Sequence, residues 1–288
     1  MFSIVIPTFN NIDYLKLCIK SLKQNSKYNH QIIPHINIGE DGTEEYLKSE
    51  SIEYTFTKYN SGICEGMNRA SKKAKFDYIL YAHDDFYFCP DWDQVMLKEI
   101  KSIGHENFYL SGIMMNNGPI KLDCGKDIHT FDEKKLLNNY KNHNLYDFQG
   151  STWAPHLIHK KIWDKVGGFS EEFFPGTGSD PDLNMKLWKV GIRIFKGLND
   201  CKVYHFGSIV TRKYKDHPTI KTESGSKGSK IFLLKWGISI KFFKKHYLRS
   251  DTSYNGALQN PKKTLDYYFE LFLCKFHYLY VLTLSKLK

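Results

Sequence analysis

The chain has 288 residues, long enough for one large α/β domain with an appendage, and its hydrophobic content of 41% is compatible with a core. Residues 1–210 hold 25 Lys or Arg and 26 Asp or Glu, whereas residues 211–288 hold 16 and 5, so the basic excess lies in the tail. Six scattered cysteines without a C-x-x-C argue against a disulfide framework or a zinc site and favour a reducing, cytoplasmic compartment.

The first third of the chain alternates between predicted strands and helices. Apolar runs predict strands over residues 3–7, 31–38, 52–57 and 77–82. Helical spacing of apolar residues predicts helices over 10–24 and 62–75. This alternation favours a doubly wound, mostly parallel α/β sheet with helices on both faces, in which ligands bind beyond the carboxyl ends of the strands.

The middle of the chain continues the pattern with a long irregular insert. The segment 116–147 is polar and weakly periodic, which predicts loops over the sheet. Further strands are predicted over 107–115, 148–158, 192–195 and 202–205. Further helices are predicted over 93–103, 160–166 and 179–190.

The basic tail combines a polar segment with aromatic, amphipathic segments. Residues 211–229 predict a linker, and residues 230–288 predict helices whose apolar runs are too short to span a bilayer. Such helices either lie in a membrane interface or pack on the body or on a second copy of the chain. We favour membrane contact, which would place the protein peripherally on the inner face of a membrane.

An acidic pair ends one of the predicted core strands. The apolar run from Tyr78 stops at Asp84 and Asp85, and two adjacent carboxylates repel each other. A divalent cation shared with a phosphate-bearing ligand would relieve that repulsion. The alternative is a solvated pair that begins a loop before Pro90.

Five ordered segments resemble the motifs of family 2 glycosyltransferases, which have the GT-A fold. Val5-Ile6-Pro7-Thr8-Phe9-Asn10 resembles the opening motif of that family. The remaining similar segments, which extend the match over roughly residues 3–206, are Glu40-Asp41-Gly42-Thr43, Asn60-Ser61-Gly62 with Asn68-Arg69, His83-Asp84-Asp85, and Gly167-Gly168-Phe169-Ser170-Glu171 followed by Gly178-Ser179-Asp180-Pro181-Asp182-Leu183.

The resemblance implies a division of the chain and a donor site. Residues 1–105 would bind the nucleotide-sugar, residues 106–210 the acceptor, and residues 211–288 would form a C-terminal extension. For Arg69, a phosphate contact and a surface position on a helix are equal alternatives. The implied donor-binding residues are Pro7, Thr8, Phe9, Asn10, Asp41, Asn60, Gly62, Asn68, Arg69 and Asp84.

The resemblance also implies a metal ligand and a catalytic base. Asp85 would bind Mn²⁺ or Mg²⁺, and His205 would complete the metal shell unless it is a packed histidine. Asp180 would take the proton of the attacking hydroxyl, although a helix N-cap would also explain an aspartate there. The implied acceptor-binding residues are Trp153, His156, Ser179 and Asp182, with a core tryptophan as the alternative for Trp153.

Two residues depart from the family pattern. His83 stands where the family has the first aspartate of its D-x-D motif, which leaves the donor open, and Ser179 stands where it usually has glutamate. The expected activity is an inverting, metal-dependent transfer from a nucleoside-diphosphate sugar, with a UDP-sugar favoured, to a hydroxyl of a glycan or lipid-linked glycan. One alternative is a GT-A scaffold that binds a nucleotide or glycan without turnover. The other is a nucleic-acid-binding protein, which only the basic tail suggests and no nucleic-acid motif supports. The sequence leaves open whether the chain forms a homo-oligomer.

Overall fold

A computed structural model describes residues 1–207, 209–210 and 226–286. These residues form one nine-stranded sheet in the order β3-β2-β1-β4-β8-β6-β9-β5, with β7 paired to β9. The strands are β1 (Ser3–Phe9), β2 (Gln31–Asn37), β3 (Thr55–Thr57), β4 (Tyr78–Tyr81), β5 (Phe86–Phe88), β6 (Phe108–Asn116), β7 (Phe148–Gln149), β8 (His156–His159) and β9 (Ile194–His205).

The sheet is mostly parallel, as predicted. Strands β1, β2, β3 and β4 are parallel neighbours, and β6 and β9 run in the same direction as these four. Strand β8 is antiparallel to both β4 and β6, and β5 and β7 are antiparallel to β9. The direction therefore reverses locally in the middle of the sheet and at one edge.

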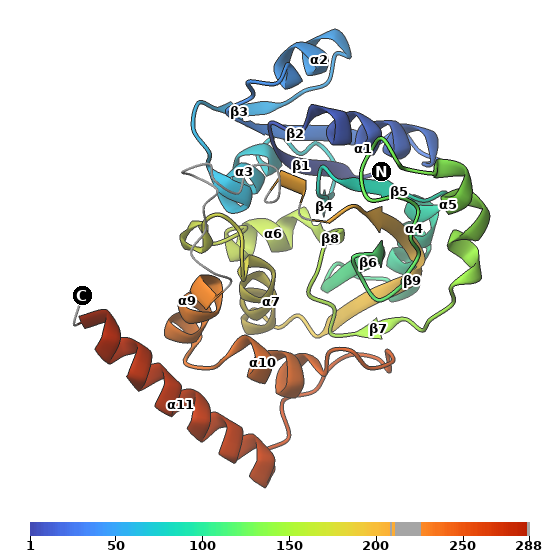
Figure 1. Cartoon of the computed structure of the whole chain (residues 1–288). Helices are drawn as coiled ribbons and strands as arrows, with labels where there is room; N and C mark the ends of the chain where they lie inside the picture. The colour runs from blue at the N-terminus through green and yellow to red at the C-terminus, as the bar shows by residue number, and fades with distance from the viewer. Residues whose placement is uncertain (208, 211–225, 287–288) are drawn as a thin grey trace.

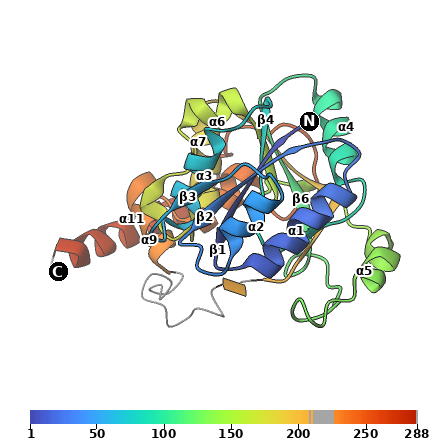
Figure 2. The same cartoon turned by 90° about the horizontal axis from the view of Figure 1, so that it is seen from above.

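Helices cover both faces of the sheet, also as predicted. The helices α1 and α4 lie on one side, and α3, α6 and α7 lie on the other (Figure 2). In α1, Leu15, Cys18, Ile19 and Leu22 are buried at helical spacing, so one stripe faces the sheet. The helices of the body are α1 (Ile12–Gln24), α2 (Thr43–Ser49), α3 (Gly62–Ser71), α4 (Trp92–Ile103), α5 (Glu133–Asn139), α6 (Lys160–Val166) and α7 (Ser179–Lys189).

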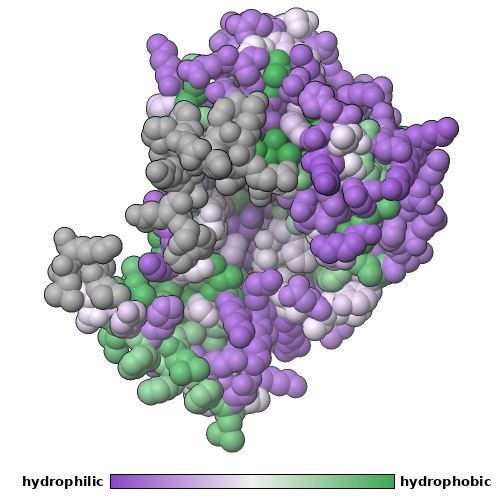
Figure 3. Space-filling view, viewed as in Figure 1, coloured by the Kyte–Doolittle hydropathy of each residue, from purple (hydrophilic) through white to green (hydrophobic). Residues whose placement is uncertain are grey.

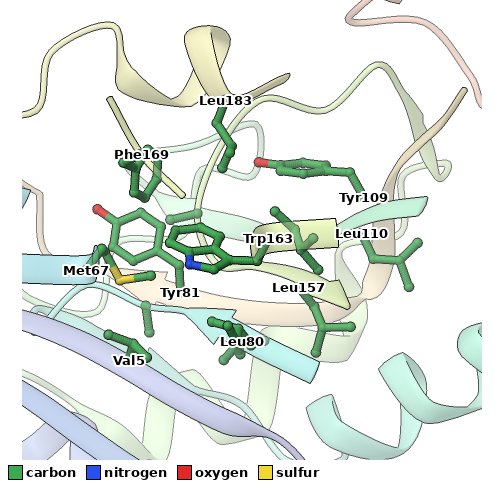
Figure 4. Packing of buried hydrophobic residues seen from close by; sticks show 14 of the residues in the cluster. Val5, Met67, Leu80, Tyr81, Tyr109, Leu110, Leu157, Trp163, Phe169 and Leu183 are labelled. Carbon is green, nitrogen blue, oxygen red and sulfur yellow. The ribbon is translucent and has the colours of Figure 1, made fainter. Parts of the chain in front are cut away.

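A contiguous core of large side chains joins the sheet to α3, α6 and α7. Figure 4 shows Tyr81 of β4 beside Phe169, with Trp163 of α6 and Leu157 of β8 packed next to them. Burying a large apolar side chain contributes about 1.5–3 kcal/mol. This packing fixes the end of β4 against the loop that precedes α7.

Several predicted boundaries were wrong for reasons of pairing. The predicted strand 148–158 is two strands, because β7 pairs with β9 whereas β8 lies between β4 and β6. The predicted strands 192–195 and 202–205 are one strand, β9, whose register on β6 shifts so that residues 198–201 leave the ladder. Helices α2 and α5 and strand β5 were not predicted, and helix α3 ends at Ser71 rather than at residue 75.

The C-terminal extension packs on the body through its first helices. It contains α9 (Ser226–Trp236), α10 (Ile240–Phe242), a π-helical segment (Phe243–Leu248) and α11 (Leu265–Lys286). Phe232, Phe242 and Phe243 belong to the main core, and α11 lies along the outer side of α9 and α10 (Figure 1). Of the predicted linker 211–229, residues 211–225 lie outside the described part, and residues 226–229 begin α9. Across the described ranges, every helix is either too short or too polar to cross a bilayer.

Candidate functional site

A cavity of about 450 Å³ opens at the carboxyl ends of β1, β2 and β4. This is the edge of the sheet at which the sequence predicted a ligand. Both predicted halves of the body contribute to it, since its walls come from the first 85 residues and from two later loops. The described residues that line it are Pro7, Thr8, Phe9, Asn37, Asn60, Gly62, Ile63, Tyr81, His83, Asp84, Asp85, Pro175, Gly176, Thr177, His205, Ile209 and Val210.

The acidic pair lies in the floor of this cavity and is buried. Asp84 accepts a hydrogen bond from the Thr8 hydroxyl at 2.7 Å, which ties it to the end of β1. Burial and the neighbouring charge of Asp85 raise the pKa of Asp84 to about 7. The pair is therefore not a solvated loop start, because each carboxylate is less than 10% exposed.

Asp85 lies between two histidines. Its Oδ1 is 3.5 Å from Nε2 of His205 and 3.9 Å from Nδ1 of His83, and its Oδ2 accepts from the Gly207 N–H at 3.1 Å. Burial alone would raise the pKa of Asp85, but the contact with His205 and the hydrogen bond from Gly207 outweigh it and lower that pKa. Burial lowers the pKa of His83 to about 4, so its imidazole is neutral and keeps a lone pair.

Strand pairing explains why residues so distant in sequence meet here. Phe86 of β5 pairs with His205 of β9, and the Phe206 N–H donates to the backbone carbonyl of Asp85. One ligand atom from each of His83, Asp85 and His205 lies within 4.8 Å of the others. Two imidazoles and a carboxylate at this spacing fit a divalent transition-metal ion. The predicted metal residues Asp85 and His205 are thus brought together, and His83 joins them.

Asn37 was missed by the sequence reasoning. Its Oδ1 accepts from both the N–H and the hydroxyl of Ser61, and its Nδ2 donates to the Thr8 carbonyl at 3.2 Å. It therefore holds the end of β1 against the start of α3. Its position as the last residue of β2 is the signal that would have found it, because polar residues at strand ends form this edge.

Gly62 permits the close approach of the loop that forms the opposite wall. It has φ of +71°, and a Cβ there would lie 2.9 Å from the carbonyl oxygen of Pro175 and 2.9 Å from Cδ2 of Phe174. An L side chain at this position would be strained and would collide with the wall. The Ile63 N–H also donates to the Pro175 carbonyl, which fixes the start of α3 to this loop.

Asp180, the predicted base, is the second residue of α7. Its side chain is 28% exposed, and its Oδ1 lies 3.8 Å from Nδ1 of His156 without accepting a hydrogen bond from any described residue. Burial raises the pKa of Asp180 to about 7. The residue is thus not saturated by a capping bond, and its carboxylate is partly desolvated.

Tyr81 packs against His156, whose Nδ1 lies 3.8 Å from Oδ1 of Asp180. The Tyr81 ring lines the cavity, and burial followed by the charges of Asp180, Asp84 and Asp85 raises the pKa of its phenol well above the usual range. Asp180 is not among the residues that line the cavity, but it acts on a side chain that does. His156 is the strand partner of Tyr81, the last residue of β4, so Asp180 lies near the strand end that the acidic pair follows.

Four predicted donor residues lie outside the cavity walls. The Asp41 carboxylate accepts from the Ile12 N–H at the start of α1 and from Thr43 at the start of α2. Arg69 pairs with Glu65 one turn away on the surface of α3. Asn68 holds the turn before α7, because its side chain donates to and accepts from the backbone of Phe169. Asn10 also lies outside the walls, and its Oδ1 accepts from the Glu40 N–H.

The predicted acceptor residues make internal contacts. Asp182 is fully buried, accepts from Ser170 and Trp236, and forms an ion pair with Lys235 of α9 at 3.0 Å. His156 is buried between the rings of Tyr81, Tyr109 and Phe169. Trp153 donates to the Gly112 carbonyl, and Ser179 donates to the Gly176 carbonyl. Nδ1 of His156 lies 3.8 Å from the Asp180 carboxylate, and Ser179 directly precedes Asp180 in the chain.

Comparison with known sequences identifies two similarities. The model of glycosyl transferase family 2 matches residues 3–156, more than half of the chain. A Haemophilus influenzae protein described as an uncharacterized glycosyltransferase is 27% identical over 114 residues. That match covers 38% of this chain and 37% of the relative, so the chain is matched over little more than a third of the relative's length.

Comparison with solved structures identifies the same fold. Residues 1–349 of S. aureus TarS align with a TM-score of 0.55 and 14% identity, covering 81% of this chain and 69% of that one. The same fragment in complex with UDP-GlcNAc aligns with a TM-score of 0.55 and 12% identity, covering 97% and 81%. Its complex with UDP gives 0.52 and 12%, covering 84% and 74%. At these identities the likeness establishes the fold alone.

Proposed function

The chain belongs to glycosyl transferase family 2, and from that premise we propose that it transfers a sugar from a nucleoside-diphosphate donor to a hydroxyl of a glycan or lipid-linked glycan. The observation that carries the proposal is the cavity that joins the acidic pair to a histidine–carboxylate cluster. The TarS fragment of the same fold is described in complex with UDP and UDP-GlcNAc, which favours a UDP-sugar as the donor.

The donor side of the reaction requires neutralisation of a leaving diphosphate. Cleavage of the sugar–phosphate bond leaves negative charge on that group, and a bound divalent cation would supply the compensating positive charge. His83, Asp85 and His205 are the residues that would hold it. Two imidazole ligands favour Mn²⁺ over Mg²⁺, which prefers oxygen ligands and water. Asp84, held by Thr8, would face the nucleoside side of the donor.

The acceptor side requires removal of a proton. We assign this role to Asp180, which would accept the proton of the acceptor hydroxyl as its oxygen attacks the anomeric carbon. A pKa of about 7 leaves about half of the carboxylate ionised at neutral pH and makes it a stronger base than an exposed aspartate. Attack opposite the leaving diphosphate is a single displacement, which inverts the anomeric centre.

Ligand binding and turnover test the two halves of the proposal separately. UDP-, GDP-, CMP- and dTDP-sugars are screened by thermal shift with and without Mn²⁺, and we expect stabilisation by a UDP-sugar that needs the metal ion. Asp85→Ala should remove the metal-dependent part of this shift. Asp180→Asn should keep the shift and lose transfer, whereas Asp164→Asn on the surface should keep both.

The controls decide between turnover and binding alone. A protein that binds the donor but shows neither transfer nor donor hydrolysis with Mn²⁺ would be a scaffold rather than an enzyme. If none of the nucleotide-sugars stabilises the protein at any metal concentration, the proposal that it binds a nucleoside-diphosphate sugar is wrong. Normal transfer by Asp180→Asn would remove the base assignment and leave the metal assignment standing.

A further inference from the structure

Helix α11 presents one face to the protein and the opposite face to solvent. Tyr267, Cys274 and Val281, seven residues apart, are buried on the inner face, where the helix contacts α9 and α10. The Ser239 N–H donates to the sulfur of Cys274, which fixes this contact. The position of the helix on the body is therefore defined by its buried seam.

The outer face of α11 is a continuous apolar stripe. Its residues recur at intervals of one, three and four positions, and each is between 48% and 90% exposed. Figure 3 shows hydrophobic surface gathered along the lower left edge of the molecule, where Figure 1 places α11. The residues of this stripe are Leu265, Tyr268, Phe269, Phe272, Leu273, Phe276, Leu279 and Tyr280.

The charged residues of the helix lie beside the stripe rather than in it. Nζ of Lys245, in the π-helical segment after α10, forms ion pairs with the carboxylates of Asp266 at 2.7 Å and Glu270 at 2.8 Å. Lys275 lies at the other edge of the stripe. A helix with an apolar surface on both sides is ordinarily covered on both sides. We therefore expect the outer face of α11 to be covered by an apolar partner.

The charge around α11 decides between a lipid surface and a second copy of the chain. Residues 226–286 hold 11 Lys or Arg and 3 Asp or Glu. Two such tails placed face to face would bring like charges together, which costs binding energy. An anionic lipid surface would attract them instead, and aromatic side chains are favoured at the level of the lipid headgroups.

Basic residues also lie at one end of the helix. Lys262 and Lys263 lie just before α11, and a surface hollow in the extension, next to Asp266 of α11, is lined in part by Lys241, Lys244 and Arg249. We propose that α11 lies in the interface of a membrane that contains anionic lipids, with its apolar stripe among the acyl chains and these basic residues at the headgroups. The inference does not depend on the proposed catalytic activity.

Sedimentation with vesicles tests the proposal on the full chain. Vesicles of phosphatidylcholine alone are compared with vesicles of phosphatidylcholine and phosphatidylglycerol, and we expect binding to the anionic vesicles that weakens as salt is raised. The triple variant Phe269→Ser, Phe272→Ser, Phe276→Ser should bind them about 100-fold more weakly, because three apolar side chains no longer enter the membrane.

A matched triple variant controls for the loss of exposed apolar surface elsewhere. Tyr28→Ser, Leu137→Ser, Leu145→Ser removes exposed apolar residues of the body and should bind vesicles like the unaltered chain. Thermal melting of both variants checks that each is folded. Because no described residue of α11 lines the cavity, the α11 variant should retain the thermal shift produced by a nucleotide-sugar.

Three results would overturn the proposal. The first is failure of the unaltered chain to sediment with anionic vesicles. The second is equal vesicle binding by the unaltered chain and by the α11 triple variant. The third is a dimer in sedimentation velocity that the α11 variant converts to monomer, since the stripe would then be the surface of a second copy.

Discussion

Replacing Asp180 by asparagine should make the protein more stable and less active. The isosteric amide keeps the shape of the carboxylate but cannot ionise, so it cannot act as a base. It also avoids the cost of a desolvated negative charge, which burial imposes on Asp180 and which raises its pKa from 3.8 to about 7. One substitution therefore separates a contribution to chemistry from a contribution to folding.

The magnitude follows from the linkage between proton binding and folding. The difference between a pKa of 3.8 and one of about 7 corresponds to a cost to the folded state of at most about 4 kcal/mol, at 1.36 kcal/mol per pKa unit. The side chain is 28% exposed, so solvent screening reduces the cost, and we take about 2 kcal/mol. For a chain of this size that is an increase in Tm of about 4–8 °C. Loss of a general base should lower the transfer rate by about 10²–10⁴-fold.

The pH dependence of the difference in Tm is the decisive measurement. The folded state holds the Asp180 proton more tightly than the unfolded state, so the unaltered chain loses this stability as pH rises from about 4 to about 7. Melting curves of both proteins without ligand should nearly coincide at the acid end and separate above pH 7, with Asp180→Asn the more stable. A difference that stays constant with pH, or a less stable variant at about pH 8, would refute the argument.

Three further variants probe other parts of the site. Asp85→Ala should weaken Mn²⁺-dependent UDP binding at least about tenfold in calorimetry, and an unchanged affinity would remove Asp85 from the metal site. Lys235→Met leaves the buried carboxylate of Asp182 without its cation and should lower the free energy of unfolding by about 2 kcal/mol, measured by denaturation in urea. The double variant with Asp182→Asn should recover part of this stability. Gly62→Ala should cost about 1–3 kcal/mol more than Gly104→Ala, because φ is nearly the same at both positions but only the Cβ at Gly62 meets a neighbour; equal costs would show that the wall yields freely.

Strands β1, β2 and β4 and helices α1 and α3 could be predicted because local signals agree in these segments. In β1 and β4 an apolar run stops at a polar group, and in α1 and α3 the apolar residues recur at helical spacing. The polar ends of these strands then fall at one edge of a parallel sheet. That reasoning predicts Thr8 and the acidic pair at the edge of the sheet where the cavity lies.

The remaining features depend on contacts between residues distant in sequence. The place of β8 between β4 and β6 follows from pairing that periodicity does not encode. His83 replaces the first aspartate of the family motif, and its place beside Asp85 and His205 requires the pairing of β5 with β9. Asp182 was expected to bind acceptor, but Lys235 and Trp236 reach it from a helix more than 50 residues later.

That contact has a practical consequence for anyone shortening the chain. A truncation after Val210 would remove Lys235 and Trp236 from the Asp182 carboxylate and would uncover the apolar side chains that now pack against Phe232 and Phe243. Inactivity of such a fragment would report misfolding and would reveal nothing about lipids. A version for crystallography should retain the whole extension, including α11. It should alter only the aromatic side chains that face outward on α11.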